Sequence, residues 1–226
     1  MRKGITGVVA VVGLLSTSGV ALAQGATSDA KTQLGINFAL MVPQGDFERA
    51  LGTNNYGVGI HSMVAIGSSP FWVGVDVLGV WYGFVVQQQP LSTTIPNVFL
   101  KVTTQDSIIG VHGLVRVLPR EGVLRPYAEA VVGTKRFVTQ TFVASSREEL
   151  ASSRNFLSDH IRSYGVGAGV QSKLSKFTAL DVGVRYLRGG QATYLKVRGE
   201  GNRVVFDKFT SGTDSLTLQI GVAFKF

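Results

Sequence analysis

The sequence predicts an all-β protein, an eight-stranded antiparallel up-and-down transmembrane β-barrel. Three observations predict this fold: segments in which apolar and polar residues alternate, connections that are alternately short and long, and an N-terminus typical of exported proteins. Alternation with a period of two gives a strand one apolar and one polar face. In a barrel that crosses a bilayer the apolar face meets lipid, so no second layer has to cover it.

The first residues have the pattern of a secretory signal peptide. Arg2 and Lys3 precede an apolar run over residues 4–15, and Ala21-Leu22-Ala23 is a small-x-small cleavage pattern. The run is far shorter than the roughly 20 residues that a spanning helix needs. The expected division is a signal peptide at 1–23, a short periplasmic segment at 24–32 and an outer-membrane barrel at 33–226.

The composition fits an exported protein with many strands. The chain has 28 Gly, 6 Pro and no Cys, so hydrogen bonds and packing, not disulfides, must hold the fold. Its formal net charge is +8, and the basic residues are scattered. Because the chain is exported, this charge favours anionic lipid headgroups over nucleic acid. The expected lipid partners are outer-membrane lipids and lipopolysaccharide, and no nucleic acid is expected.

Eight alternating segments follow one another along the chain. We expect strands at residues 33–42, 56–65, 71–83, 106–117, 125–135, 163–171, 177–187 and 216–226. The first four have apolar faces that include Leu34, Ile36 and Phe38; Val58 and Ile60; Val73, Val75 and Trp81; and Val111, Val115 and Val117. The fifth is apolar on both faces apart from Glu129, so its register is open. The last three carry Tyr164 and Val166; Val182 and Val184; and Leu218, Ile220 and Val222.

The connections test this arrangement independently. Short connections are expected at 66–70, 118–124 and 172–176, and long ones at 43–55, 84–105, 136–162 and 188–214. Strict alternation of short and long is what an up-and-down barrel with periplasmic turns and extracellular loops requires. Within the last loop, Tyr194–Val197 and Arg203–Phe209 predict a hairpin. Ser146 and Glu149 predict a capping box before a short helix.

Four stretches resemble the small eight-stranded outer-membrane barrels of the OmpA and OmpX type. They are Pro43-Gln44-Gly45-Asp46-Phe47, Arg125-Pro126-Tyr127-Ala128-Glu129-Ala130, Tyr164-Gly165-Val166-Gly167-Ala168-Gly169, and the C-terminal strand ending in Phe224-Lys225-Phe226. The resemblance implies an integral outer-membrane protein that the outer-membrane assembly machinery inserts. That machinery would read the terminal signal formed by Leu218, Ile220, Val222, Phe224 and Phe226.

Charged residues on the polar faces predict a network inside the barrel. By parity, the side chains that point inward are Asp76, His112, Arg116, Glu129, Asp181, Arg185 and Lys225. An eight-stranded barrel has a narrow interior that side chains fill, and charges there must pair. We expect a structural plug; a gated pore or proton path is the alternative.

No pattern of catalytic or cofactor-binding residues is evident. His61 and Ser62 are adjacent and so face opposite sides of a strand, His112 has no Ser on its own face, and His160 is expected in a loop. No metal-ligand spacing and no nucleotide fingerprint occurs, so no cofactor is expected. A lipid-modifying enzyme and a secreted soluble barrel that holds an apolar ligand remain alternatives.

The expected role is structural or adhesin-like, with the long loops presented to an extracellular partner. Loops on a rigid scaffold are where binding usually resides. The aromatic residues that such a partner would contact are Tyr56, Phe142, Phe156, Tyr194, Phe206 and Phe209.

Overall fold

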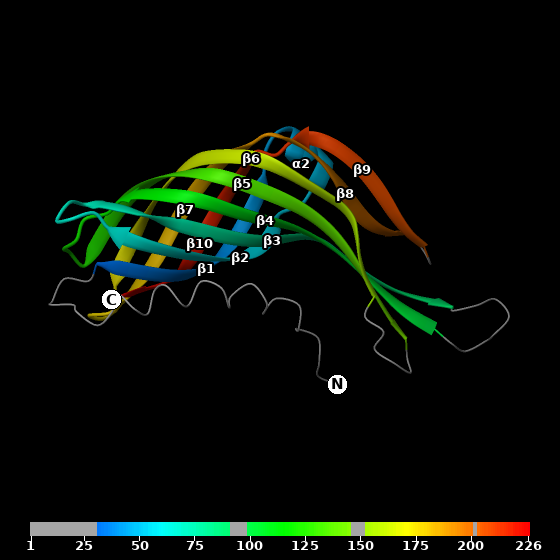
Figure 1. Ribbon diagram of the computed structural model, residues 1–226, viewed down its shortest axis with the longest axis horizontal. Coiled ribbons are helices and arrows are strands. Elements are labelled where there is room, and N and C mark those ends of the chain that lie inside the picture. The colour runs from blue at the N-terminus through cyan, green and yellow to red at the C-terminus, as the bar shows by residue number, and fades with distance from the viewer. Residues whose placement is uncertain (1–30, 91–98, 146–151, 201–202) are drawn as a thin grey trace.

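The computed structural model describes residues 31–90, 99–145, 152–200 and 203–226, which form a closed barrel with a small second sheet (Figure 1). The barrel strands are β1 (Thr32–Pro43), β2 (Asn55–Ala65), β3 (Phe71–Pro90), β4 (Phe99–Val117), β5 (Leu124–Ser145), β6 (Ser152–Lys173), β7 (Thr178–Gly189) and β10 (Ser215–Lys225). All neighbours are antiparallel, in the order β1-β10-β7-β6-β5-β4-β3-β2. The predicted eight-stranded barrel is confirmed. The expected signal peptide and the helix expected after Ser146 lie outside the described residues.

The first and last strands close the sheet. Ile36 pairs with Val222 and Leu40 with Leu218 along an uninterrupted register between β1 and β10. At the end of this pair where the short turns lie, the Thr32 amide donates to the Phe226 carbonyl at 3.1 Å. Closure leaves no sheet edge within the barrel wall, so the backbone groups there pair with one another instead of facing lipid.

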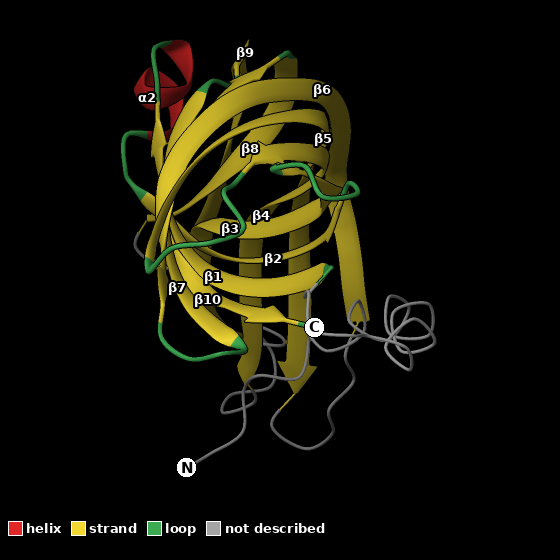
Figure 2. Cartoon of the chain, turned by 90° about the vertical axis from the view of Figure 1, so that its left-hand side faces the viewer, coloured by secondary structure: helices red, strands yellow, loops and turns green. Residues whose placement is uncertain are grey.

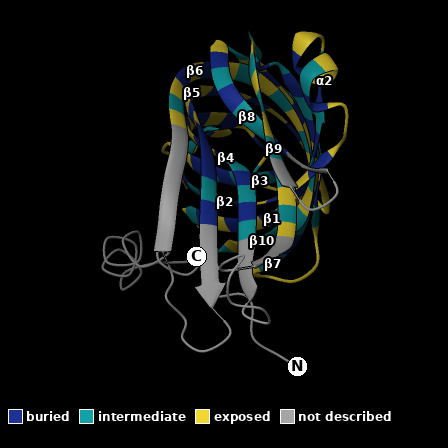
Figure 3. Cartoon of the chain, turned by 90° about the vertical axis from the view of Figure 1, so that its right-hand side faces the viewer, coloured by how far each residue is buried: buried dark blue, intermediate teal, exposed yellow. Residues whose placement is uncertain are grey.

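The apolar faces point outward, as the sequence predicts. On β10, Leu218 is 45% exposed and Ile220 52%, whereas Thr217 and Ala223 are fully buried inside. Figure 3 shows the same alternation along the other strands. A band of exposed aliphatic side chains results, bounded by aromatic residues at both ends. The exposed aromatic residues that bound the band are Phe71, Phe177, Phe224 and Phe226 at the end with the short turns, and Tyr56, Tyr164 and Tyr186 at the other. Phe38 is exposed within the band, beside Tyr56. We take these two belts of aromatic side chains as the limits of the membrane-spanning segments.

Four strands continue beyond that band, where the sequence analysis expected loops at 84–105 and 136–162. β3 and β4 pair out to Pro90 and Phe99, and β5 and β6 pair almost as far, so those loop predictions are wrong. The β3–β4 pairing shifts register between Trp81 and Gly83, just past the belt of aromatic side chains. On β3 this shift moves the outward side chains from odd to even positions, where Phe84 and Val86 are exposed, so alternation continued from Phe71 does not reveal the extension.

A helix was also missed in the first long connection. α2 (Asp46–Leu51) has Phe47 and Leu51 on one buried side, and Gly52 follows it with φ 69° and donates its amide to the Glu48 carbonyl. Two apolar residues four apart and a glycine after the last turn were the available signals. Six residues are too few for such periodicity to stand out. Within the described residues, no helix has both the length and the apolar character that crossing a bilayer would take.

The hairpin predicted in the last connection is confirmed. β8 (Gln191–Glu200) pairs with β9 (Arg203–Gly212) as a separate two-stranded sheet. It does not prolong β7 and β10; it runs beside the extended parts of β3 to β6 (Figures 1 and 2). We call α2, this hairpin and the extended strand ends the cap.

The lipid-facing band leads to a prediction for stability in a bilayer. Replacing Ile220, near the middle of the band, by Arg is expected to lower the free energy of unfolding by about 2–4 kcal/mol, because the charge enters hydrocarbon. The measurement is urea unfolding in phospholipid vesicles. Val123→Arg, in the turn between β4 and β5, is the matched control with a change of at most about 1 kcal/mol. Equal stability of Ile220→Arg and wild type would mean that this face contacts water.

Candidate functional site

The barrel centre holds a network of two arginines and three carboxylates. Arg116 donates to Glu129 at 2.7 Å and to Asp181 at 3.0 Å. Arg185 donates to Glu129 and to Asp76, both at 2.7 Å. The five side chains come from β3, β4, β5 and β7, and at most 8% of any of them is exposed. The charges therefore link opposite walls of the barrel.

Neutral groups surround this network. The Tyr127 hydroxyl donates to Asp181 at 2.7 Å, and the Tyr127 ring lies 3.9 Å from the Arg116 guanidinium carbon. Gln171 donates to the other Asp181 oxygen at 2.8 Å and accepts from Arg125. Tyr127, Gln171 and Arg125 were not among the predicted members of the network. Alternation along the strands could have identified two of them, since Tyr127 shares the face of Glu129 and Gln171 continues the inward glycine row of β6.

Two predicted members of the network lie apart from its centre. His112 Nδ1 is 3.9 Å from Asp76, and its Nε2 is 2.7 Å from the Ser163 hydroxyl. The expectation that His112 has no serine neighbour is wrong, because Ser163 of β6 contacts it. Alternation along β4 shows which side His112 faces but not which residues of other strands lie there. Lys225 is half-buried at the periplasmic mouth, and no ion pair of Lys225 occurs within the described residues.

Inward glycines provide room for the long side chains. A Cβ at Gly183 would overlap the Tyr127 hydroxyl, and one at Gly167 would lie 2.8 Å from Glu129 Oε1. Gly167 belongs to the inward glycine row of β6, and Gly183 lies between the inward residues Asp181 and Arg185 of β7. The narrow interior therefore accommodates the arginines because these two positions contribute only backbone.

A buried apolar layer separates the network from the cap. Its aliphatic part consists of Ala39, Met41, Leu78, Val80 and Ile108. Above it, Phe137 stacks on Tyr194 with ring centroids 5.1 Å apart, and Phe47 of α2 meets Tyr194 edge-on at 5.7 Å. A path for water through the barrel would have to cross this layer.

Side chains of the barrel hold the hairpin through the free backbone edge of β8. The Thr193 amide donates to Asp159 at 2.8 Å, the Tyr82 hydroxyl donates to the Leu195 carbonyl at 3.2 Å, and the Val197 amide donates to Asp106 at 2.9 Å. These are alternate residues, whose backbone groups point away from β9. Three side chains from β6, β3 and β4 therefore take the place of a neighbouring strand.

Lys196 joins the hairpin to the connection between β1 and β2. Its ammonium donates to the Leu51 carbonyl at 2.5 Å and lies 3.5 Å from the Ala50 carbonyl, at the C-terminal end of α2. A cation there satisfies carbonyls that the helix itself leaves unpaired. The first and last long connections are thus tied together.

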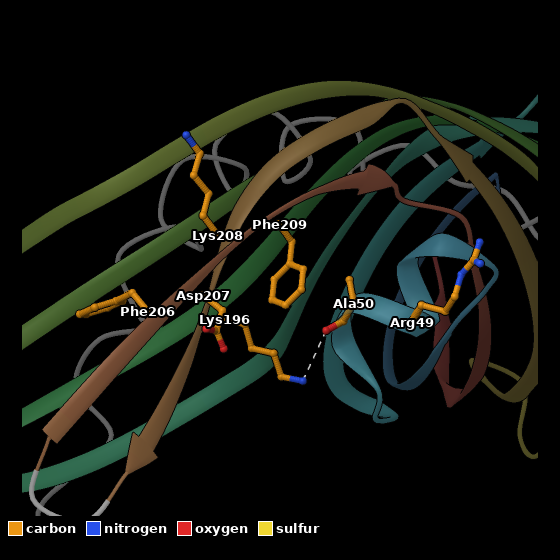
Figure 4. A pocket seen from close by; sticks show the side chains of 7 residues that line it. All are labelled: Arg49, Ala50, Lys196, Phe206, Asp207, Lys208 and Phe209. Carbon is orange, nitrogen blue, oxygen red and sulfur yellow. Dashed lines mark hydrogen bonds between the residues drawn. The ribbon is translucent and has the colours of Figure 1, made fainter.

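An open basic cleft lies between α2 and β9 (Figure 4). Its volume is about 510 Å³, and its lining residues are Arg49, Ala50, Lys196, Phe206, Asp207, Lys208 and Phe209. Phe209 lies between strand and helix, with Lys208 and Arg49 on opposite sides of the view. Three cations and one carboxylate line the cleft, and one of the cations, Arg49, also forms an ion pair with Asp46 of α2, so the cleft keeps a formal charge of +1 with Asp46 included. Positive charge beside aromatic rings suits an anionic partner with flat or apolar faces.

The aromatic residues expected to contact a partner lie in different parts of the structure. Tyr194 is 1% exposed and belongs to the core of the cap, so that expectation is wrong for it. Tyr56 is 58% exposed but stacks on Phe38 in the membrane band. Phe206 and Phe209 line the cleft. The side chains of Phe142 and Phe156 lie outside the described parts of the structure.

The closed wall, the exposed apolar band and the charged, plugged lumen define the class of the protein. It is a small eight-stranded antiparallel transmembrane β-barrel, as the sequence predicts. Across residues 31–90, 99–145, 152–200 and 203–226 no group of three His, Cys, Asp or Glu side chains is arranged to hold a metal ion.

No family model and no curated protein matches the sequence. The fold is similar to Neisserial surface protein A, at 17% identity over 88% of this chain and 98% of that chain, with a TM-score of 0.45. It is also similar to Ail of Yersinia pestis, solved with the heparin analogue sucrose octasulfate, at 11% identity over 88% and 99% of the two chains, with a TM-score of 0.43. The N-terminal barrel of Pseudomonas aeruginosa OprF matches at 13% identity over 87% and 99%, with a TM-score of 0.36.

The central network predicts a large effect for loss of one arginine. Arg185→Ala leaves Asp76 and Glu129 without a shared cation in a buried site, so stability should fall by about 3–5 kcal/mol. Lys173→Ala, which removes an exposed charge, should change stability by at most about 0.5 kcal/mol. Urea titration of both variants in the same vesicles measures the difference. Matching midpoints for the two would show that the network contributes little.

Docking of the hairpin is predicted to weaken as pH rises. Burial raises the pKa of Asp106 above its ordinary 3.8, although hydrogen bonds from Thr139 and Val197 draw this pKa down. A raised pKa in the docked state means that docking is strongest below the ordinary value and is lost progressively as pH passes through the raised one. The measurement is the hydrogen-exchange protection factor of the Val197 amide against pH.

The control for this experiment is Asp106→Asn, which keeps an acceptor oxygen without a titrating proton. Its protection factor should be independent of pH over the same range. A protection factor that rises with pH in the wild type, or an equal slope in the variant, would contradict the assignment to Asp106.

Proposed function

We propose that this protein is an integral outer-membrane protein with a non-catalytic, adhesin-like role, presenting its cap to a negatively charged extracellular partner. In this proposal a cleaved signal peptide directs export and the assembly machinery inserts the barrel. The observation that carries it is the folded cap, which has its own buried core and exposes a basic, aromatic cleft beyond the membrane band.

The lumen favours a plug over the alternative of a pore. Each arginine of the central network contacts two carboxylates, and the apolar layer lies above them. An ion would have to leave water, cross that layer and compete with buried ion pairs. The structural interpretation of the network is therefore the one we adopt.

The enzyme alternative has one specific arrangement to consider. Ser163, His112 and Asp76 follow one another in space, with His112 2.7 Å from the serine hydroxyl. All three are 1% exposed, and the histidine-to-carboxylate separation of 3.9 Å exceeds a hydrogen bond. A lipid could not reach this serine in the folded barrel. Phospholipid hydrolysis by the purified protein, abolished by Ser163→Ala, would contradict a non-catalytic role.

A binding experiment tests the role of the cleft. Cells that display the protein are expected to bind fluorescent heparin, used as a densely sulfated probe, and to bind little neutral dextran. The double variant Arg49→Glu/Lys208→Glu should lose about tenfold in affinity, because two favourable charges become repulsive. Lys176→Glu, in the turn at the opposite end of the barrel, is the control and should bind as wild type does.

The same cells test membrane placement separately. Heat-modifiable gel migration reports a folded barrel, and protease added to intact cells should cut the hairpin but not residues 172–176 in the β6–β7 turn. Cleavage within that turn on intact cells would contradict the topology. Unchanged heparin binding by the double variant, with the topology intact, would contradict only the assignment to the cleft.

A further inference from the structure

A row of arginines lies on the outer wall of the barrel, immediately beyond the belt of exposed tyrosine side chains. On β7 the outward series Val182, Val184 and Tyr186 is followed by Arg188. On β6 the next outward residue after Tyr164 is Arg162. One outward step along a strand is about 6.6 Å, so these guanidinium groups begin where the apolar band ends.

Strand register places three arginines next to one another. Arg188 pairs with Tyr164, so Arg162 is its diagonal neighbour on β6. Arg162 pairs with Thr134, and Arg136 is the next outward residue of β5. Diagonal neighbours in an antiparallel sheet are about 7–8 Å apart, within reach of long side chains. The three cations therefore form one continuous row across β5, β6 and β7, and the exposed His160 lies opposite Arg136.

The surrounding acidic groups are already engaged. Asp214 accepts from the Tyr186 hydroxyl and from the Gly189 amide, each at 3.0 Å. Asp159 accepts from the Thr193 amide. Within the described residues, none of the three arginines forms an ion pair, and Arg136 donates only to the Ser158 hydroxyl, at 2.8 Å. Within the described part of the protein, the row therefore has no carboxylate partner of its own.

The outward residues at the corresponding ends of the neighbouring strands are uncharged: Val42 on β1, Phe84 on β3, and Ser107 and Gln105 on β4. The outward arginines are thus confined to one side of the barrel and to the depth of the external headgroups. Guanidinium groups pair with phosphate in a bidentate manner, and several together suit a headgroup that bears more than one phosphate.

We propose that Arg136, Arg162 and Arg188 bind the phosphorylated saccharide headgroup of a glycolipid in the external leaflet, the chemistry found in lipopolysaccharide. Tyr164 and Tyr186 lie directly below the row and would pack against the start of the acyl chains. This inference rests on the proposed outer-membrane location and assigns a lipid site distinct from the cleft of the cap.

The test measures lipid affinity of the folded barrel by native mass spectrometry in mild detergent. The probes are bisphosphorylated lipid A, the same lipid A after phosphatase treatment, and phosphatidylglycerol. Wild type is expected to bind bisphosphorylated lipid A about tenfold more tightly than either other probe, a ratio that one charge-assisted hydrogen bond accounts for. The double variant Arg162→Gln/Arg188→Gln should lose this preference.

The controls separate this inference from the proposed function. Lys176→Gln removes a positive charge at the opposite end of the same two strands and should keep the full preference for bisphosphorylated lipid A. Arg162→Lys/Arg188→Lys keeps the charge without the bidentate geometry and should retain part of it. Equal binding of phosphatidylglycerol, or an unchanged preference in the glutamine variant, would overturn the site. A chain that stayed soluble and showed no heat-modifiable form would instead overturn the outer-membrane location.

Discussion

Closure of the sheet is the constraint on which the structure depends. Hydrocarbon offers no hydrogen-bond partners, so each backbone group at that depth must be paired within the wall, and the β1–β10 register completes the pairing. With eight strands a closed wall leaves a narrow centre. Long charged side chains fit there because glycines such as Gly167 and Gly183 face them, and the charges are tolerated because Arg116 and Arg185 each contact two carboxylates.

Beyond the membrane band the same strands are surrounded by water and by the cap instead of lipid. Water can satisfy a free edge there, and the extended strands still bury their inward faces by packing against the hairpin and α2. The hairpin is attached without adding to the barrel sheet, since Asp106, Tyr82 and Asp159 take up the backbone groups that β8 leaves free. The result is a rigid platform built largely from side-chain contacts, on which the basic cleft is exposed.

The spanning part of the fold could be predicted from sequence because lipid on one side and a crowded lumen on the other impose a strict alternation. Parity also identified inward residues as far apart as Asp76 and Arg185. The cap was less accessible: Tyr194 reads as a surface aromatic until the contacts of Phe47 and Phe137 are known, and both come from distant segments. Ser163 and His112 meet for a similar reason, since contacts across a barrel follow from curvature and not from spacing along one strand.

The bond between Lys196 and the end of α2 has a mechanical consequence. α2 follows β1, and β8 precedes β10, so this bond bridges the seam where the two ends of the sheet meet. The Gln44 amide, which donates to the Asp214 carbonyl at 2.9 Å, adds a second strap at the same rim. Separation of β1 from β10, starting at this end, would therefore require both bonds to break first. The cap thus fastens the seam of the barrel from outside the membrane band.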